Sequence, residues 1–209
     1  MLAPLTLTLT EHRIGVVGAN GSGKSSLARL FNGLTTPTSG QVLVDGLDVA
    51  RQGSQVRRRV AFCFTDPAAQ IVMPTCVEDV ELSLRRTERQ ASQRRDRALA
   101  VLDRFGLADH AHASVHTLSG GQRQLLALAG VLAVEPAVLV ADEPTTLLDL
   151  ANTRRVADLL FGLDQQLVLV THDLELAGRC DRVLVLAEGD LAYDGAADDA
   201  VEHYQALVG

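Results

Sequence analysis

A glycine-rich segment between two different hydrophobic patterns constrains this chain more than any other feature. Residues 18–25 read GANGSGKS and match the pattern GxxxxGK followed by Ser or Thr. Residues 13–17 before it are typical of a short buried strand, and the apolar residues after it recur at helical spacing up to Gly33. A strand, a glycine loop and a helix in this order predict an α/β fold in which the loop binds phosphate.

The residue types in this phosphate loop suit a nucleotide. Its glycines let consecutive backbone N–H groups curl around phosphate oxygens, and the start of the next helix adds its dipole. Lys24 is the only lysine in the chain, and it supplies a compact charge for the outer phosphates, while the Ser25 hydroxyl is suited to bind Mg²⁺. The residues predicted to contact the nucleotide are Gly18, Ala19, Asn20, Gly21, Ser22, Gly23, Lys24, Ser25 and Ser26.

Composition excludes several classes of protein. The net charge of -7 leaves no broad basic surface for nonspecific nucleic-acid binding. The longest apolar stretch, residues 125–134, is much shorter than the roughly 20 residues that cross a bilayer. The first ten residues lack a basic signal-peptide region, which predicts a cytoplasmic protein. Three widely spaced cysteines, Cys63, Cys76 and Cys180, are expected to be reduced and buried.

Two further patterns predict the remaining architecture. Leu and Thr alternate over residues 5–10, which predicts a half-buried strand, and residues 41–44 and 47–49 flank Asp45-Gly46 as in a hairpin. Together they predict a small antiparallel sheet. After a strand at residues 60–64, residues 77–84 and 92–105 have helical periodicity and predict a helical insertion.

Arginines crowd the start of this insertion, with only Glu88 and Asp96 to balance them. They are Arg85, Arg86, Arg89, Arg94, Arg95 and Arg97. A solvated face is the ordinary interpretation of such a cluster, and a docking patch for an acidic or lipid-proximal surface is the alternative.

A second glycine motif decides between the many classes of phosphate-loop protein. Residues 118–122 read LSGGQ at the start of a helical pattern, and Ser119 with Gln122 fits a capping box. The sequence here resembles the ATP-binding cassette (ABC) ATPases, whose signature is LSGGQ. In that family two copies hold ATP between the phosphate loop of one and the signature of the other. The resemblance implies that Ser119, Gly120, Gly121 and Gln122 face the ATP of a second ATPase subunit, with a homodimer favoured.

Other segments agree with this resemblance in order and spacing. It implies that Asp142 holds the Mg²⁺ shell and that Glu143 polarises the attacking water. It also implies that Asp149 links the two sites of a dimer and that His172 contacts the terminal phosphate. Strands are predicted at residues 137–140, 167–170, 182–186 and 191–193, followed by a short helix at the end of the chain.

The chain departs from the family at two places. No aromatic residue precedes Phe31 to stack on adenine, and His12 is the nearest candidate for that contact. Thr65 occupies the position of a glutamine that reaches Mg²⁺ in the family, and Thr is shorter. Residues 66–75 continue in a way similar to the ATPases of energy-coupling factor importers, most like the biotin-type systems.

These observations predict an α/β fold with a phosphate-loop core, a mainly parallel sheet, a small antiparallel subdomain and a helical insertion. We expect one ABC ATPase domain over residues 1–209, with a helical subdomain near residues 66–130. The expected function is the ATP-hydrolysing motor of an energy-coupling factor importer for a vitamin or metal ion, with biotin favoured. Its expected partners are a transmembrane coupling subunit and a substrate-binding membrane subunit, at the cytoplasmic face of the cell membrane.

The sequence disfavours two alternative interpretations. A soluble ABC ATPase of translation or DNA maintenance usually carries two cassettes or long coiled coils, whereas this chain has one cassette and no heptad run. A metal site at His110, His112 and His116 is the second alternative. The neighbouring sequence does not supply the further carboxylate or cysteine ligands that such a site needs.

Overall fold

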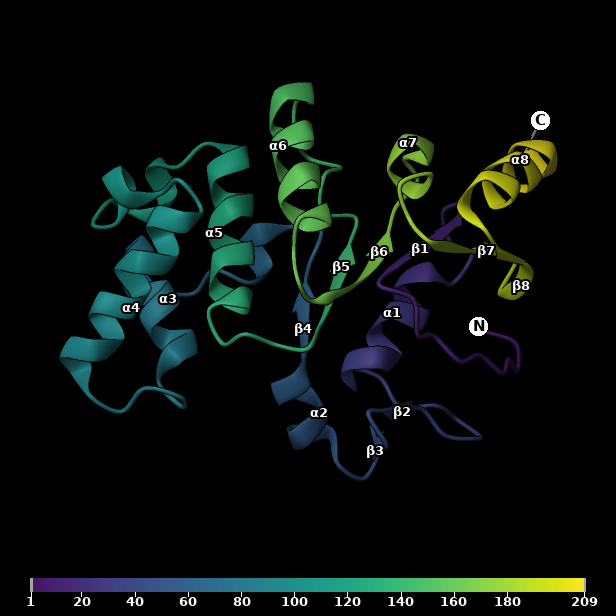
Figure 1. Cartoon of the computed structure of the whole chain (residues 1–209), viewed down its shortest axis with the longest axis horizontal. Helices are drawn as coiled ribbons and strands as arrows, with labels where there is room; N and C mark the ends of the chain where they lie inside the picture. The colour runs from purple at the N-terminus through teal and green to yellow at the C-terminus, as the bar shows by residue number, and fades with distance from the viewer. Residues whose placement is uncertain (1, 209) are drawn as a thin grey trace. The chain divides into compact units, whose positions relative to one another are not determined.

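The computed structural model describes residues 2–208, and they form two compact units (Figure 1). Among the described residues, the first unit comprises 2–62, 137–143 and 159–208. The second unit comprises Cys63–Pro136 and Pro144–Asp158. Each unit is therefore built from segments that are distant in the sequence.

A six-stranded sheet has the order β4-β5-β6-β1-β7-β8. Its strands are β1 (Arg13–Gly18), β4 (Val60–Cys63), β5 (Val138–Asp142), β6 (Gln166–Val170), β7 (Arg182–Ala187) and β8 (Asp190–Gly195). Strands β5, β6, β1 and β7 pair in parallel, and β8 pairs with β7 antiparallel. The parallel strands are apolar along nearly their whole length because helices cover both faces of such a sheet. The predicted mainly parallel sheet is confirmed.

The core of the first unit lies against this sheet. Ile14, Leu139, Leu167 and Leu184 are fully buried. The helices that begin in this unit are α1 (Lys24–Asn32), α2 (Gly53–Arg59), α7 (Leu174–Ala177) and α8 (Ala197–Val208). Helix α2 has no apolar stripe because Val56 is its only buried residue, which explains why the sequence pattern did not predict it.

The predicted hairpin is confirmed. Strands β2 (Leu43–Val44) and β3 (Leu47–Asp48) pair antiparallel. Asp45 and Gly46 join them with φ of 49° and 76°, the left-handed conformation that a two-residue turn of this kind requires.

The second unit is helical, as predicted for the insertion. Its helices are α3 (Cys76–Leu84), α4 (Ala91–Arg104) and α5 (Gly120–Leu132), and they pack against one another (Figure 1). Helix α6 (Leu150–Phe161) begins in this unit and ends in the first. Leu102, Leu125 and Leu128 are fully buried in the second unit.

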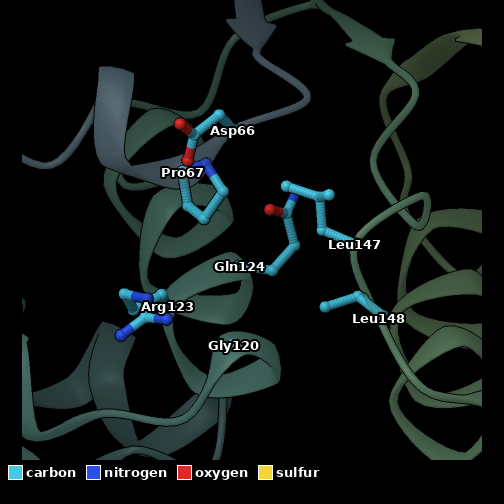
Figure 2. Close-up of a pocket in the computed structure, with 7 residues that line it drawn as sticks. All are labelled: Asp66, Pro67, Gly120, Arg123, Gln124, Leu147 and Leu148. Atoms are coloured by element: carbon cyan, nitrogen blue, oxygen red, sulfur yellow. The ribbon is translucent and has the colours of Figure 1, made fainter.

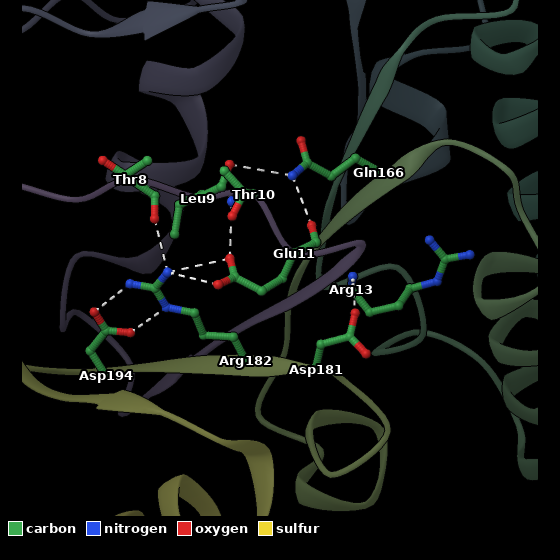
Figure 3. Close-up of polar contacts among 9 residues, drawn as sticks. All are labelled: Thr8, Leu9, Thr10, Glu11, Arg13, Gln166, Asp181, Arg182 and Asp194. Atoms are coloured by element: carbon green, nitrogen blue, oxygen red, sulfur yellow. Dashed lines mark hydrogen bonds and ion pairs between the residues drawn. The ribbon is translucent and has the colours of Figure 1, made fainter.

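The prediction of a strand at residues 5–10 is wrong. These residues alternate in exposure, yet within the described chain they form no strand. Side chains bind their carbonyl groups instead (Figure 3): Arg182 Nη1 donates to Thr8 O at 2.8 Å, and Gln166 Nε2 donates to Leu9 O at 3.5 Å. Arg182 also forms a bidentate pair with Asp194 at 2.6 and 2.7 Å. Alternation of apolar residues shows which side chains face the core, but it does not supply a partner strand.

The cysteines are reduced and buried, as predicted. Burial raises the pKa of the Cys180 thiol to about 12 and also raises the pKa of Cys76, so neither is a ready thiolate. Among residues 2–208, none of the helices combines the length and apolar character that crossing a membrane requires.

A buried arginine joins β1 to the end of α6. Arg13 is 7% exposed, and its guanidinium donates to the carbonyls of Gln165 at 2.9 Å, Phe161 at 3.0 Å and Leu163. These carbonyls lie at the last turn of a helix and just beyond it, where no helical N–H can reach them. A cation at this end also complements the helix dipole.

We predict that Arg13→Ala lowers the free energy of unfolding by about 3 kcal/mol, because it leaves several carbonyls without a charged donor. Urea unfolding measures this change. Arg58→Ala is the control, since Arg58 is exposed and its removal is expected to change stability by less than about 0.5 kcal/mol. Equal effects of the two substitutions would contradict this role for Arg13.

Candidate functional site

Three neighbouring strands end at one edge of the sheet and carry the polar residues predicted for the site. β5, β6 and β1 are adjacent and parallel. Val170 is level with Val16 on one side and with Asp142 on the other. The segments that follow these strands therefore meet, and they include the phosphate loop, Glu143 and His172.

Only glycine fits at position 18, where the phosphate loop begins. A Cβ on Gly18 would lie 2.2 Å from the carbonyl oxygen of Leu186 and 2.6 Å from Ser22 Oγ. Gly18 also has a φ of 153°, which side chains disfavour. The backbone therefore passes close to β7 before it turns into α1.

The loop ends in a helix terminus suited to an anion. Helix α1 has Gly23 as its N-cap, and no side chain caps it, so its first N–H groups have no intrahelical acceptor. Ser22 Oγ is buried and, among residues 2–208, has no hydrogen-bond partner. Lys24 is 7% exposed, and its Nζ donates to Gly18 O at 2.7 Å and Ala19 O at 3.1 Å. Amides, a hydroxyl and a cation thus converge on one small region.

A second contact joins the helix to the sheet. Ser25 Oγ lies 3.0 Å from Asp142 Oδ1, and Asp142 is 4% exposed. Burial raises the pKa of the Asp142 carboxyl, and the hydrogen bond from Ser25 opposes this increase. A hydroxyl and a carboxylate at this distance are hard oxygen donors of the kind that Mg²⁺ prefers, and Mg²⁺ commonly takes its other ligands from phosphate and water.

Glu143, the residue after Asp142, makes a further contact at this edge of the sheet. Glu143 Oε2 lies 2.7 Å from His172 Nδ1. Glu143 has a φ of 53°, a left-handed conformation that is costly for a residue with a side chain. Its backbone N–H is held by Val170 O at 2.9 Å. The strained backbone turns the carboxylate toward the histidine that follows β6.

The second unit contains the LSGGQ segment. Ser119 caps α5: its Oγ accepts from Gln122 N at 3.2 Å, and Gln122 Oε1 accepts from Ser119 N at 2.8 Å. The predicted capping box is confirmed. Ser119 is exposed, and its hydroxyl can still donate a hydrogen bond while it accepts one. This helix start is therefore a second place where an anion could be bound.

Asn152 is a residue that the sequence analysis missed. Its backbone N and its Nδ2 each donate to the Asp149 carboxylate at 2.9 Å, which lowers the pKa of Asp149. A Cβ on Gly121 would lie 2.3 Å from the Asn152 amide, so the amide packs directly on the α5 backbone. Asn152 thereby links Asp149 to the LSGGQ segment. Only the three-dimensional contact reveals this, because Asn at the start of a helix is common.

Thr65 is the second residue after β4, in a loop that is fixed to α5. Gln70 Oε1 accepts from Phe64 N at 3.2 Å, and Gln70 Nε2 donates to Ala127 O at 2.7 Å. The Gln70 amide is therefore occupied on both sides. A cavity of about 100 Å³ opens beside this loop (Figure 2). Its lining residues are Asp66, Pro67, Gly120, Arg123, Gln124, Leu147 and Leu148.

The candidate adenine contact at His12 is wrong. His12 precedes β1, and its Nε2 lies 2.9 Å from Asp164 O. The phosphate loop follows the other end of this strand, which is about 20 Å away at the usual rise per residue. Of the other histidines, His112 Nδ1 lies 3.3 Å from Arg95 Nη2, and His110 Nε2 lies 2.8 Å from Gln122 Nε2. Within residues 2–208 no three His, Cys, Asp or Glu side chains gather to hold a metal.

We predict that Asp142→Asn raises the thermal unfolding temperature of the nucleotide-free, metal-free chain near pH 7. The raised pKa means that the ionised carboxylate is less favourable in the folded state than in the unfolded state, and Asn removes that charge. The gain should vanish as the pH falls below the unfolded pKa of about 3.9. Calorimetry at two pH values checks this, and a lower unfolding temperature at pH 7 would contradict it.

The chain matches a known protein family and several curated relatives. The family model described as ABC transporter matches residues 2–146 of the chain. A relative from Rhizobium etli named biotin transport ATP-binding protein BioM is 44% identical over 206 residues, covering 99% of this chain and 92% of the relative. A relative from Caulobacter vibrioides named methionine import ATP-binding protein MetN is 41% identical, covering 90% of this chain and 59% of the relative.

Two solved structures are similar over most of the chain. CbiO1 from Clostridium perfringens, titled as part of the ABC transporter complex cbiONQ, has a TM-score of 0.85 at 30% identity and covers 99% of this chain and 86% of its own. The ATP-binding cassette MJ0796, titled as a dimeric post-hydrolysis state bound to ADP and Pi, has a TM-score of 0.84 at 31% identity. The match covers 94% of this chain and 90% of MJ0796.

Proposed function

The chain belongs to the ABC transporter family as an ATPase, and on that premise we propose that it is the ATP-hydrolysing motor of an energy-coupling factor importer. The observation that carries the proposal is the pair of contacts at one sheet edge, Ser25 with Asp142 and Glu143 with His172, beside the uncapped start of α1. They support the proposal because they would provide a cation site, a base and an anion site in one place.

The phosphate loop is proposed to hold the triphosphate of ATP. Its backbone N–H groups and the Ser22 hydroxyl would donate to phosphate oxygens, and Lys24 would exchange its carbonyl partners for the outer phosphates. Ser25 and Asp142 would hold Mg²⁺, with Thr65 proposed as a further oxygen ligand. When bound, Mg²⁺ neutralises charge on the phosphate oxygens.

Glu143 is proposed as the residue that activates water. Its carboxylate would accept a hydrogen bond from the water and take its proton as the water oxygen attacks the terminal phosphorus and the bond to ADP breaks. His172 is exposed, and its ring contacts the Glu143 carboxylate through Nδ1. It would keep the carboxylate aimed at the water and contact the terminal phosphate.

A second copy of the chain is proposed to complete each site. Ser119 is exposed and keeps a free hydroxyl donor, so the LSGGQ segment, Ser119 with Gly120, Gly121 and Gln122, can bind the ATP held by another phosphate loop. The dimeric MJ0796 cassette supports this arrangement. Asp149 is hydrogen-bonded to Asn152, whose amide packs against Gly121. Through this link, occupancy of the LSGGQ segment would affect Asp149 and thereby the partner subunit.

The relatives support a proposal for the membrane partners and the substrate. BioM is named for biotin transport and cbiO1 for a transporter complex, which supports an importer with a transmembrane coupling subunit and a substrate-binding membrane subunit. Biotin is the favoured substrate, and other vitamins or metal ions are alternatives. In this arrangement the chain lies at the cytoplasmic face of the membrane as a peripheral subunit.

We predict that Glu143→Gln lowers ATP hydrolysis by about 10²- to 10⁴-fold, because the amide cannot accept the proton. Nucleotide binding should persist, since the loop and Asp142 are unchanged. The variant should therefore form a dimer that depends on ATP and Mg²⁺, which light scattering detects.

The double variant Glu143→Gln with Ser119→Arg is the control. An arginine at this position would obstruct the partner's phosphates, so the double variant should stay monomeric while it still binds ATP. A single variant that remains monomeric with saturating ATP would refute the homodimer. Persistent hydrolysis would refute the role of Glu143.

A further inference from the structure

The turn between α3 and α4 concentrates positive charge in an acidic chain. We define the arginine corner as Arg85, Arg86 and Arg89, which lie within five residues of the second unit. All three side chains are exposed. The chain as a whole has a net charge of -7, so the corner carries positive charge in a chain that is negative overall.

The three arginines that follow the corner already have partners. Arg95 pairs with Glu81 at 3.2 Å, and Arg97 pairs with Glu135 at 2.9 Å. Arg94 Nη1 donates to a backbone carbonyl of the turn at 3.2 Å. By contrast, among the ion pairs of residues 2–208 none joins Arg85, Arg86 or Arg89 to a carboxylate. The fold thus pairs two arginines of the cluster with carboxylates and a third with a carbonyl, and it leaves Arg85, Arg86 and Arg89 exposed to solvent.

The arginines around α2 provide an internal comparison. Arg59 pairs with Asp45 at 2.9 Å, Arg51 pairs with Asp48 at 3.9 Å, and Arg57 lies 3.5 Å from a backbone carbonyl. That cluster is as rich in arginine as the corner but is mostly matched by its own neighbours. Within residues 2–208, two arginines around α2 thus pair with carboxylates, whereas none of the three in the corner does.

We propose that the arginine corner binds the anionic phospholipid headgroups of the membrane surface. Residues 85–90 are all polar, so the corner lacks the apolar centre that a packed protein interface needs. It also lacks an aromatic side chain for stacking on nucleic-acid bases. A fluid anionic surface requires only exposed cations, and guanidinium groups pair well with phosphate. The inference rests on the proposed function for the nearness of a membrane.

Vesicle cosedimentation tests the proposal with the full chain. One set of vesicles contains phosphatidylcholine alone, and the other contains equal parts of phosphatidylcholine and phosphatidylglycerol, at low and physiological salt. The chain should bind only the anionic vesicles, and more weakly at higher salt. Each arginine near such a surface contributes about fivefold, so Arg85→Gln, Arg86→Gln and Arg89→Gln together should weaken binding on the order of 100-fold.

The matched control replaces Arg51, Arg57 and Arg58 with Gln, which removes the same charge from the α2 region. This variant should lose less than about fivefold, since the proposal assigns no headgroup contact to these three arginines and charges outside the contact are screened by salt. Equal losses in both variants, or no binding to anionic vesicles at low salt, would overturn the proposal. Binding of the chain to polyglutamate or DNA without binding to vesicles would also overturn the proposal. ATP hydrolysis, measured on the same preparations, tests the proposed function separately and should be unchanged in both variants.

Discussion

Parallel pairing of β5, β6 and β1 is the constraint on which the candidate site depends. Because these strands run in the same direction and are neighbours, their carboxyl ends meet at one edge, where the sheet leaves the backbone free to turn. The phosphate loop, Glu143 and His172 are brought together by this pairing alone. The contacts of Ser25 with Asp142 at 3.0 Å and of Glu143 with His172 at 2.7 Å then need only local changes of side-chain conformation. The bonds from Arg13 to the end of α6 hold the opposite end of β1.

The charges at this edge are held at some cost to the folded chain. Asp142 is buried with a raised pKa, and Glu143 adds a second carboxylate on a strained backbone. Lys24 turns inward to the carbonyls of its own loop. A nucleotide and its cation would relieve two of these features, because phosphate would receive Lys24 and a divalent ion would neutralise the Asp142 carboxylate. These features are consistent with the proposed binding of a nucleotide and its cation at this edge.

The sequence predicted the parts of the fold that depend on local patterns. Apolar runs identified the strands, helical spacing identified α3 and α4, and Ser119 with Gln122 identified the start of α5. It failed where a tertiary contact decides. Residues 5–10 alternate like a strand, but Arg182 and Gln166 take the place of a strand partner. His12 is close to the phosphate loop in sequence yet lies beyond the far end of β1. Asn152 and Gln70 acquire their contacts only when distant segments pack.

In the proposed dimer, ATP is bound between the phosphate loop of one subunit and the LSGGQ segment of the other. A mixing experiment tests it most directly, using Lys24→Ala, which disables the loop, and Ser119→Arg, which disables the segment. Each variant alone should hydrolyse almost no ATP. A mixture should recover activity, because the heterodimer pairs one intact loop with one intact segment. A silent mixture, or full activity of Ser119→Arg alone, would contradict the shared site.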